Sequence, residues 1–205
     1  MDSMFYDPRN QDRFNPRDRV DEISDRLLQV PIGHHSIILY PDLARLRIVY
    51  SNYIKAQLED ENTTATILFL PYYETSDKVR EVLVPTGINV KAHEKRGSLI
   101  IVDVMKALTS LGTKVPNLER LPNFISQVYD ANHDKTLIVI ADMSVFHNLK
   151  MSLELLDYEG NLHKTLETVR WKGLCLYNER DIETMLTEEH AIRLLSYHKE
   201  SVILN

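Results

Sequence analysis

Three short runs of the chain contain almost only apolar and β-branched residues, and this pattern constrains the fold more than any other feature. The runs occupy residues 64–70, 98–104 and 136–141. A strand with one face in water alternates apolar and polar side chains, whereas a strand covered on both faces is apolar throughout. We therefore predict buried strands in a mostly parallel sheet that is covered by helices on both faces.

The other patterns place further strands and helices in alternation along the chain. Strands are expected at 35–40, 173–177 and 201–204. Asp42 is expected to cap a helix, and helical patterns occupy 42–59, 76–83, 122–132, 180–186 and 189–197. Apolar residues from Phe146 to Leu156 indicate one long amphipathic helix. This alternation is typical of a three-layer α/β domain, which we place at residues 31–205.

The first 30 residues differ from the rest in their charge pattern. Acidic residues alternate with arginines, and Pro8 and Pro16 break any early helix. Such a segment cannot bury enough apolar surface to order itself before about residue 17. Ile23 and Leu27 then recur at helical spacing. We expect a polar tail with a short docking helix at 1–30, and the alternative is an arm that packs on a second subunit.

The composition limits the partners and the compartment. The net charge of −6 weighs against direct nucleic-acid binding, which needs a basic face to neutralise phosphates. Cys175 is the only cysteine, so the chain cannot form an internal disulfide, which suits a reducing compartment. No apolar run approaches the ~20 residues that span a bilayer, and the N-terminus lacks the apolar core of a signal peptide. We expect a cytoplasmic protein without membrane contact.

Polar side chains follow most of the predicted strands. Ligands of open parallel sheets bind beyond the carboxyl ends of the strands, so these residues are binding candidates. They are Tyr40, Asp42, Tyr73, Glu74, Asp103, Asp142, Ser144 and Tyr177. Converging carboxylates would suit Mg²⁺ binding or general-base chemistry. The alternative is that each acidic residue caps the helix that follows it.

The sequence contains none of the common catalytic or phosphate-binding motifs. None of its six glycines directly precedes a lysine, and G-x-G-x-x-G, H-E-x-x-H, C-x-x-C and G-x-S-x-G are absent. We therefore predict no catalytic residue, no cofactor and no metal site. His35 begins an apolar strand and is expected to be a hydrogen-bonded structural residue. Cys175 is expected to pack as a small hydrophobic residue.

The order of these patterns resembles the first half of a KaiC-like, RecA-type ATPase core. The similar stretches are 35–40 with the helix after it, 66–90 and GSLIIVDV at 97–104. Glu74 stands where that family has its catalytic glutamates, and VIADMS at 139–144 resembles its magnesium-positioning strand, with Asp142 in the metal-positioning place. The resemblance implies a RecA-like fold. Pro41 and Asp42, however, stand in place of the phosphate loop.

A closer resemblance is to the MEDS domain, a KaiC-like sensory domain that lacks the phosphate loop. It extends over about residues 32–204. The matching residues are His35 and Tyr40 at the first strand, Tyr158-Glu159 in a late helix, Cys175 and Tyr177 in one strand, and His198 before the last strand. The resemblance implies a sensory or regulatory role near signalling modules. It also adds His35 and Glu159 to the ligand-binding candidates.

Three functions remain open on the sequence alone. We expect a non-catalytic sensory domain of signal transduction or transcriptional control, which binds a small ligand or a regulatory partner protein at the degenerate nucleotide edge. The alternative is a residual nucleotide binder for ATP and Mg²⁺ with weak or no ATPase activity, because helix N-termini hold anions even without glycine. The third is an oligomeric scaffold, and we expect a homo-oligomer.

Overall fold

The computed structural model describes residues 20–60, 64–109, 116–166 and 169–204. These residues form a six-stranded sheet in the order β3-β2-β4-β5-β1-β6, and every neighbouring pair is parallel. The strands are His35–Tyr40 (β1), Ala65–Leu70 (β2), Leu99–Ile101 (β3), Thr136–Asp142 (β4), Trp171–Asn178 (β5) and Glu200–Ile203 (β6).

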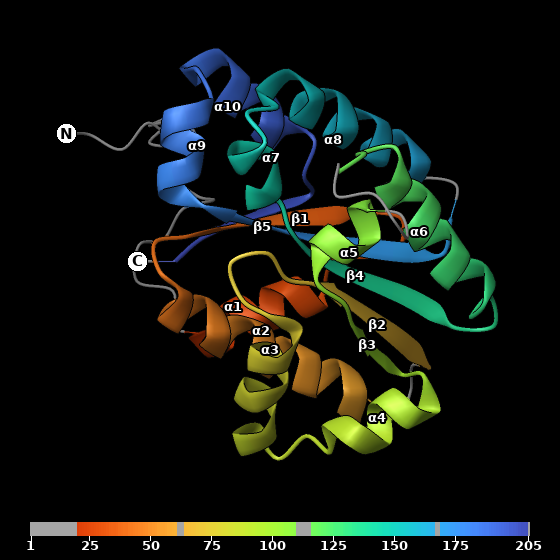
Figure 1. Ribbon diagram of the computed structural model, residues 1–205. Helices are drawn as coiled ribbons and strands as arrows, with labels where there is room; N and C mark the ends of the chain where they lie inside the picture. Colours follow the sequence, from red (N-terminus) through yellow and green to blue (C-terminus); the bar gives the residue numbers. More distant parts are fainter. Residues whose placement is uncertain (1–19, 61–63, 110–115, 167–168, 205) are drawn as a thin grey trace.

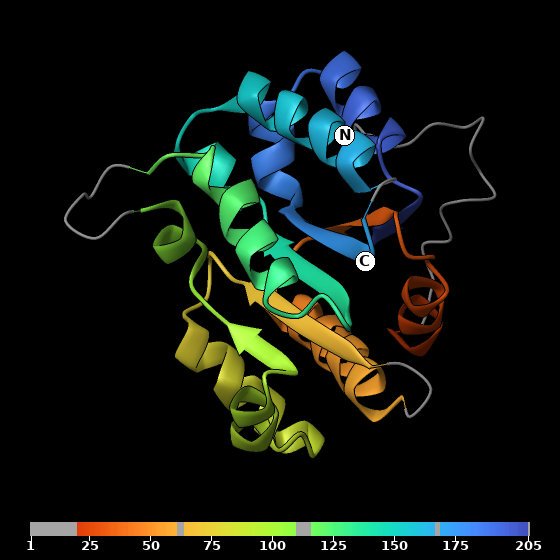
Figure 2. The same cartoon turned by 90° about the vertical axis from the view of Figure 1, so that its right-hand side faces the viewer.

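Helices cover both faces of the sheet (Figures 1 and 2). One face carries Val20–Leu28 (α1), Leu43–Glu59 (α2), Ser76–Leu83 (α3) and Val90–Arg96 (α4), with a 3₁₀ turn at Val84–Thr86. The other carries Val104–Leu108 (α5), Arg120–Asp130 (α6), Ser144–Asn148 (α7), Ser152–Leu166 (α8), Glu179–Met185 (α9) and Glu188–Ser196 (α10).

The central strands are buried along almost their whole length, which confirms the predicted three-layer α/β architecture. Every residue of β1 and β2 is buried, and so is every residue of β4 after Thr136. Alternate side chains therefore enter two separate apolar clusters, one on each face of the sheet. A parallel sheet of this kind can be stable only when helices cover both faces, because its strands have no polar side to offer water.

Two predicted elements were wrong in their extent. The strand expected at 98–104 stops at Ile101, and α5 begins three residues later. The long helix expected from Phe146 onward is two helices, α7 and α8. Between them Lys150 has a φ of 57°, in the left-handed region that ends a helix, and Met151 N–H bonds the Phe146 carbonyl at 2.9 Å.

The described part of the N-terminal segment packs on its own chain. Ile23 and Leu27 of α1 are buried in the same cluster as α2 and β6. Arg26 forms an ion pair with Glu200 of β6. The tail predicted before α1 lies outside the described residues.

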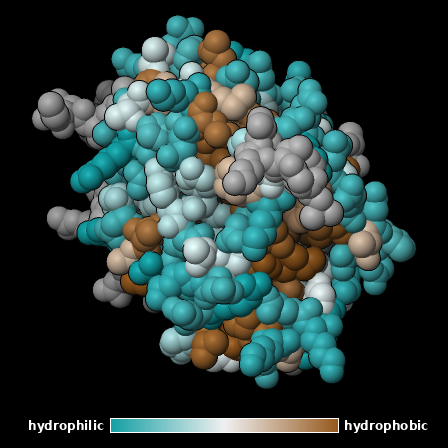
Figure 3. Space-filling model, in the orientation of Figure 1, coloured by the Kyte–Doolittle hydropathy of each residue, from teal (hydrophilic) through white to brown (hydrophobic). Residues whose placement is uncertain are grey.

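Most of the surface over the outer helices is hydrophilic (Figure 3). In the same view hydrophobic side chains gather in a few patches, one of which lies over the part where β2 and β3 are seen in Figure 1. Within the described ranges, no helix has the length and apolar character needed to cross a bilayer.

Candidate functional site

An acidic side chain, Asp42, caps the helix that follows β1. Only Pro41 and Asp42 separate the two elements, and Asp42 Oδ1 accepts a hydrogen bond from Arg45 N at 2.9 Å. The Arg45 guanidinium also pairs with this carboxylate. The backbone bond from Arg45 and this pairing lower the pKa of Asp42. The carboxylate thus occupies the N-terminus of α2, the place where an anion such as phosphate would bind.

Asp142 and Asp103 bind backbone amides at the same edge of the sheet. Asp142 accepts hydrogen bonds from Tyr73 N and Ser144 N, both at 3.1 Å. It is almost fully buried, and burial raises its pKa to about 6. Asp103 accepts from Ser76 N and Ser76 Oγ, both at 2.7 Å. Burial opposes the ionised form of Asp103, but these bonds outweigh it and lower the pKa.

Glu74 is held by two groups of α2. Arg47 Nε donates to Glu74 Oε1 at 2.8 Å, and Tyr50 Oη donates to Glu74 Oε2 at 3.3 Å. Glu74 is buried, and the Arg47 side chain is one-third exposed. The hydrogen bond to Glu74 raises the pKa of Arg47. The glutamate therefore ties the end of β2 to α2.

Tyr73 connects this edge of the sheet to α7 and α9. Its hydroxyl donates to the Asp181 carboxylate at 2.8 Å, and His147 Nδ1 lies 3.3 Å from the same carboxylate. Tyr40 is fully buried at the end of β1, and burial together with the charge of Asp142 raises its pKa. Asp181 and His147 were not predicted, because only the packing of α7 and α9 brings them to this edge.

The strand-end candidates therefore do not form one common site. They separate into small groups, and within each group the side chains bind a neighbouring side chain or a backbone amide. Asp142 links Tyr73 to Ser144, whereas Asp42, Glu74 and Asp103 each have a different set of neighbours. Asp42, Asp103 and Asp142 all accept backbone amides at the starts of helices. Asp42 and Asp142 thus bind the first turn of the helix that follows each of them, as the capping alternative expected. Asp103 differs, because its side chain binds the start of α3 and not that of α5, the helix that follows it.

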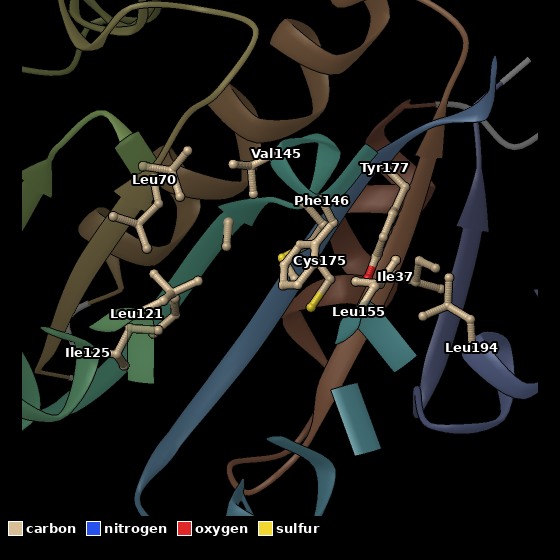
Figure 4. Packing of buried hydrophobic residues seen from close by; sticks show 14 of the residues in the cluster. Ile37, Leu70, Leu121, Ile125, Val145, Phe146, Leu155, Cys175, Tyr177 and Leu194 are labelled. Atoms are coloured by element: carbon tan, nitrogen blue, oxygen red, sulfur yellow. The ribbon is translucent and has the colours of Figure 1, made fainter. Parts of the chain in front are cut away.

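Three other predicted residues meet inside the domain, away from the edge. His35 begins β1, Glu159 lies in α8 and Tyr177 lies in β5. Cys175 of β5 and His198, which precedes β6, complete this group, which we call the interior cluster. Figure 4 shows Cys175 and Tyr177 on β5 among apolar side chains that include Phe146, Leu155 and Leu194.

Glu159 is the centre of the interior cluster. Its Oε2 lies 3.4 Å from His35 Nδ1, 3.7 Å from His198 Nε2 and 3.9 Å from Cys175 Sγ. Its Oε1 accepts a hydrogen bond from the Tyr177 hydroxyl. Cys175 Sγ lies 3.8 Å from His35 Nδ1. A thiol, two imidazoles and a carboxylate thus present one ligand atom each to the same point, and all four atoms lie within 4.8 Å of one another.

Burial sets the electrostatics of the interior cluster. Glu159 is completely buried, and no other member is more than 6 % exposed. Burial lowers the pKa of His198 to about 4, so this ring is neutral at pH 7. Burial opposes the ionised form of Glu159, but its contacts with His35 and the hydrogen bond from Tyr177 outweigh it and lower the pKa. Burial and the nearby Glu159 charge raise the pKa of Cys175.

Strand register explains why these residues meet. β1 and β5 pair in parallel with His35 opposite Gly173 and Ile37 opposite Cys175. A Cβ on residue 173 would lie 3.0 Å from the His35 Cβ, so glycine leaves room for the histidine. Lys199 N donates to the His35 carbonyl at 2.8 Å, which places His198 beside His35. The only sequence signal was polar residues within apolar strands, at positions that match the MEDS pattern.

A cavity of about 340 Å³ lies between α6 and α8. Its lining is mainly apolar, and acidic residues are also present. The main apolar residues are Leu118, Pro122, Tyr158, Leu162 and Trp171, and the acidic residues are Glu119, Glu154 and Asp157. This volume is within the usual range of small-molecule sites. Nothing in the sequence indicated it, since its lining comes from separate stretches of the chain.

Comparison with known proteins supports both the fold and the family. The structure is similar to a KaiC-like protein from the archaeon Pyrococcus horikoshii, with a TM-score of 0.61 and 12% identity over 84% of this chain and 71% of that one. A second P. horikoshii structure has a TM-score of 0.54 and 10% identity over 89% and 87% of the two chains. These likenesses confirm the predicted KaiC-like fold.

No curated protein sequence matches the chain significantly. The sequence pattern of one family, described as the methanogen/methylotroph, DcmR sensory domain (MEDS), matches residues 34–198. This range includes every member of the interior cluster and most of the sheet. The chain belongs to the MEDS family of sensory domains.

Proposed function

We propose that this chain is a non-catalytic sensory domain of signal transduction or transcriptional control. In this proposal it receives its signal by binding a small ligand or a regulatory partner protein, and it does not turn over ATP. Membership of the MEDS family supports the sensory role. The position of Asp42 supports the absence of nucleotide chemistry.

Asp42 is the observation on which the proposal depends. Nucleotide phosphates bind helix N-termini because the free N–H groups and the helix dipole attract negative charge. Here the Asp42 carboxylate accepts the Arg45 amide at the start of α2. A phosphate at this place would have to displace that carboxylate and would be repelled by its charge. Both Glu74 oxygens are in turn occupied by hydrogen bonds from Arg47 and Tyr50.

The cavity between α6 and α8 is the place we propose for a small ligand. Its mainly apolar lining favours a small apolar molecule over a nucleotide. Tyr158 lines the cavity, and the next residue in α8 is Glu159 of the interior cluster. A ligand that moved α8 would therefore also move the central carboxylate of that cluster.

Titration calorimetry with ATP and Mg²⁺ tests the nucleotide part of the proposal. We expect no saturable heat and no ATP turnover, with a KaiC-like protein that has an intact phosphate loop as the positive control. Turnover by the wild-type chain that disappears in Glu74→Gln would overturn the proposal. The alternative, residual nucleotide binding, would be supported by saturable ATP binding to the wild-type chain that becomes weaker in a variant with an additional acidic residue in α2.

Fluorescence tests the proposed ligand cavity, because Trp171 lines it and is the only tryptophan of the chain. The probe is N-phenyl-1-naphthylamine, an uncharged apolar dye that accepts energy from tryptophan. We expect saturable energy transfer from Trp171 that is lost in Ser126→Phe, which fills the cavity from α6. Gln127→Phe, at the next exposed position, is the matched control. Equal transfer in both variants would contradict this location.

A further inference from the structure

We propose that His35, Glu159, Cys175 and His198 bind one divalent transition-metal ion of the zinc type. The spacing of these residues in the sequence predicted no metal site. The proposal instead depends on the fold, which brings them together from β1, α8, β5 and the approach to β6. It is independent of whether the domain binds nucleotide.

The distances within the interior cluster are close to those of a tetrahedral metal site. A tetrahedral ion with bonds of about 2.0–2.3 Å separates its ligand atoms by about 3.3–3.6 Å. Around Glu159 Oε2 the separations are 3.4 Å to His35, 3.7 Å to His198 and 3.9 Å to Cys175. These three separations, and the 3.8 Å between His35 Nδ1 and Cys175 Sγ, are within about 0.5 Å of the tetrahedral values. Because the widest pair of the four atoms is within 4.8 Å, a side-chain adjustment of about 1 Å or less at His198 would bring all four to bonding distance from a common centre.

The ring of His198 is oriented as a metal ligand. Its Nδ1–H donates to the Leu194 carbonyl at 2.9 Å, which fixes the tautomer and leaves the lone pair on Nε2. Nε2 points into the cluster, and this completely buried atom has no hydrogen-bond partner in the described structure. A buried polar atom without a partner is costly, and a metal bond would remove that cost.

Glu159 has a similar outer support. The Tyr177 hydroxyl occupies Oε1, so that Oε2 is the oxygen turned toward the two imidazoles and the thiol. A hydrogen bond to the second oxygen of a ligating carboxylate is a common feature of metal sites, because it fixes the carboxylate plane. Two of the four ligands thus have the outer-shell partners that a metal site needs.

The donor set indicates which metal would bind and what it would do. A thiolate with two imidazoles and one carboxylate suits Zn²⁺ or a similar ion and disfavours Mg²⁺ and Ca²⁺, which prefer oxygen ligands. Four protein ligands leave no open position for a substrate, which is typical of structural sites. The ion would join α8 and the α10–β6 connection to the sheet, so its binding would stabilise the packing of that layer.

Cobalt substitution tests the proposal on the full chain. The protein is unfolded with EDTA under reducing conditions, refolded and titrated with Co²⁺. We expect one ion per chain, tetrahedral d–d bands and a thiolate-to-cobalt charge-transfer band. Because Cys175 is the only cysteine, that band can arise only from its thiolate. Circular dichroism of each refolded variant separates loss of the site from loss of the fold. Zn²⁺ at a hundredfold excess over Kd should displace Co²⁺ and raise Tm by about 5–10 °C.

Variants locate the site. Cys175→Ser should lose the charge-transfer band, and His198→Gln should lose the tetrahedral spectrum and most of the Tm increase. His163→Gln is the matched control, since that ring lies 5.8 Å from the His35 ring and is not one of the four ligands. The absence of a charge-transfer band in refolded wild-type protein would overturn the proposal. So would an equal Tm increase in wild type and His198→Gln.

Discussion

Removing the Tyr177 hydroxyl should destabilise the domain more than the loss of one oxygen atom would suggest. Tyr177 is 1 % exposed, and its hydroxyl donates to the completely buried Glu159 carboxylate. The pKa of Glu159 is lowered, so the carboxylate is ionised at pH 7 and Tyr177→Phe would leave its Oε1 without this donor. A hydrogen bond to a charged group contributes about 1.5–3 kcal/mol. For a chain of this size that corresponds to a Tm decrease of about 3–12 °C.

The assay is urea unfolding at pH 7 in buffer with EDTA, so that bound metal does not contribute. The matched control is Tyr53→Phe, in which a buried tyrosine on the opposite face of the sheet loses the same atom. Burial alone raises the pKa of Tyr53, and no carboxylate accepts its hydroxyl in the described structure. We expect a clearly smaller loss for this control. Equal losses in the two variants would refute the reasoning that Tyr177 supports a buried charge.

Two further predictions concern the edge and the strand pairing. Burial raises the pKa of Asp142 to about 6, so the folded state holds the protonated carboxyl more tightly than the unfolded state does. This contribution to stability is fully present below about pH 4 and is lost as the pH rises to about 6. Relative to wild type, Asp142→Asn should therefore gain up to about 3 kcal/mol between pH 4 and 7 in urea unfolding, and parallel pH curves would contradict this. Gly173→Ala should cost about 1–3 kcal/mol because its Cβ would lie 3.0 Å from that of His35. Gly160→Ala should cost less, since its Cβ meets only the side chain of Tyr197, and the opposite ranking in thermal unfolding would refute the steric argument.

Elements whose signal is local could be predicted closely. β1 and α3 have the expected bounds, and Asp42 caps α2 as its position before an apolar periodic stretch indicated. The errors occurred where contacts between distant segments determine the end of an element. The apolar run at 98–104 has the composition of a longer strand, but after Ile101 the chain turns so that Asp103 accepts the Ser76 amide. The break between α7 and α8 depends on the conformation of Lys150, which has no strong sequence signal.

The sequence by itself determined the α/β class, the two-sided burial of the central strands and the acidic turn in place of a phosphate loop. Each depends on residues close together in the chain, through periodicity or capping. Only the tertiary structure decided that His35, Glu159, Cys175 and His198 share one buried point. That meeting requires β5 and β6 to flank β1 in a particular register, and a shift by one residue would turn Cys175 and Tyr177 to the opposite face of the sheet. Register is set by contacts between distant segments, so the interior cluster could not be found from spacing alone.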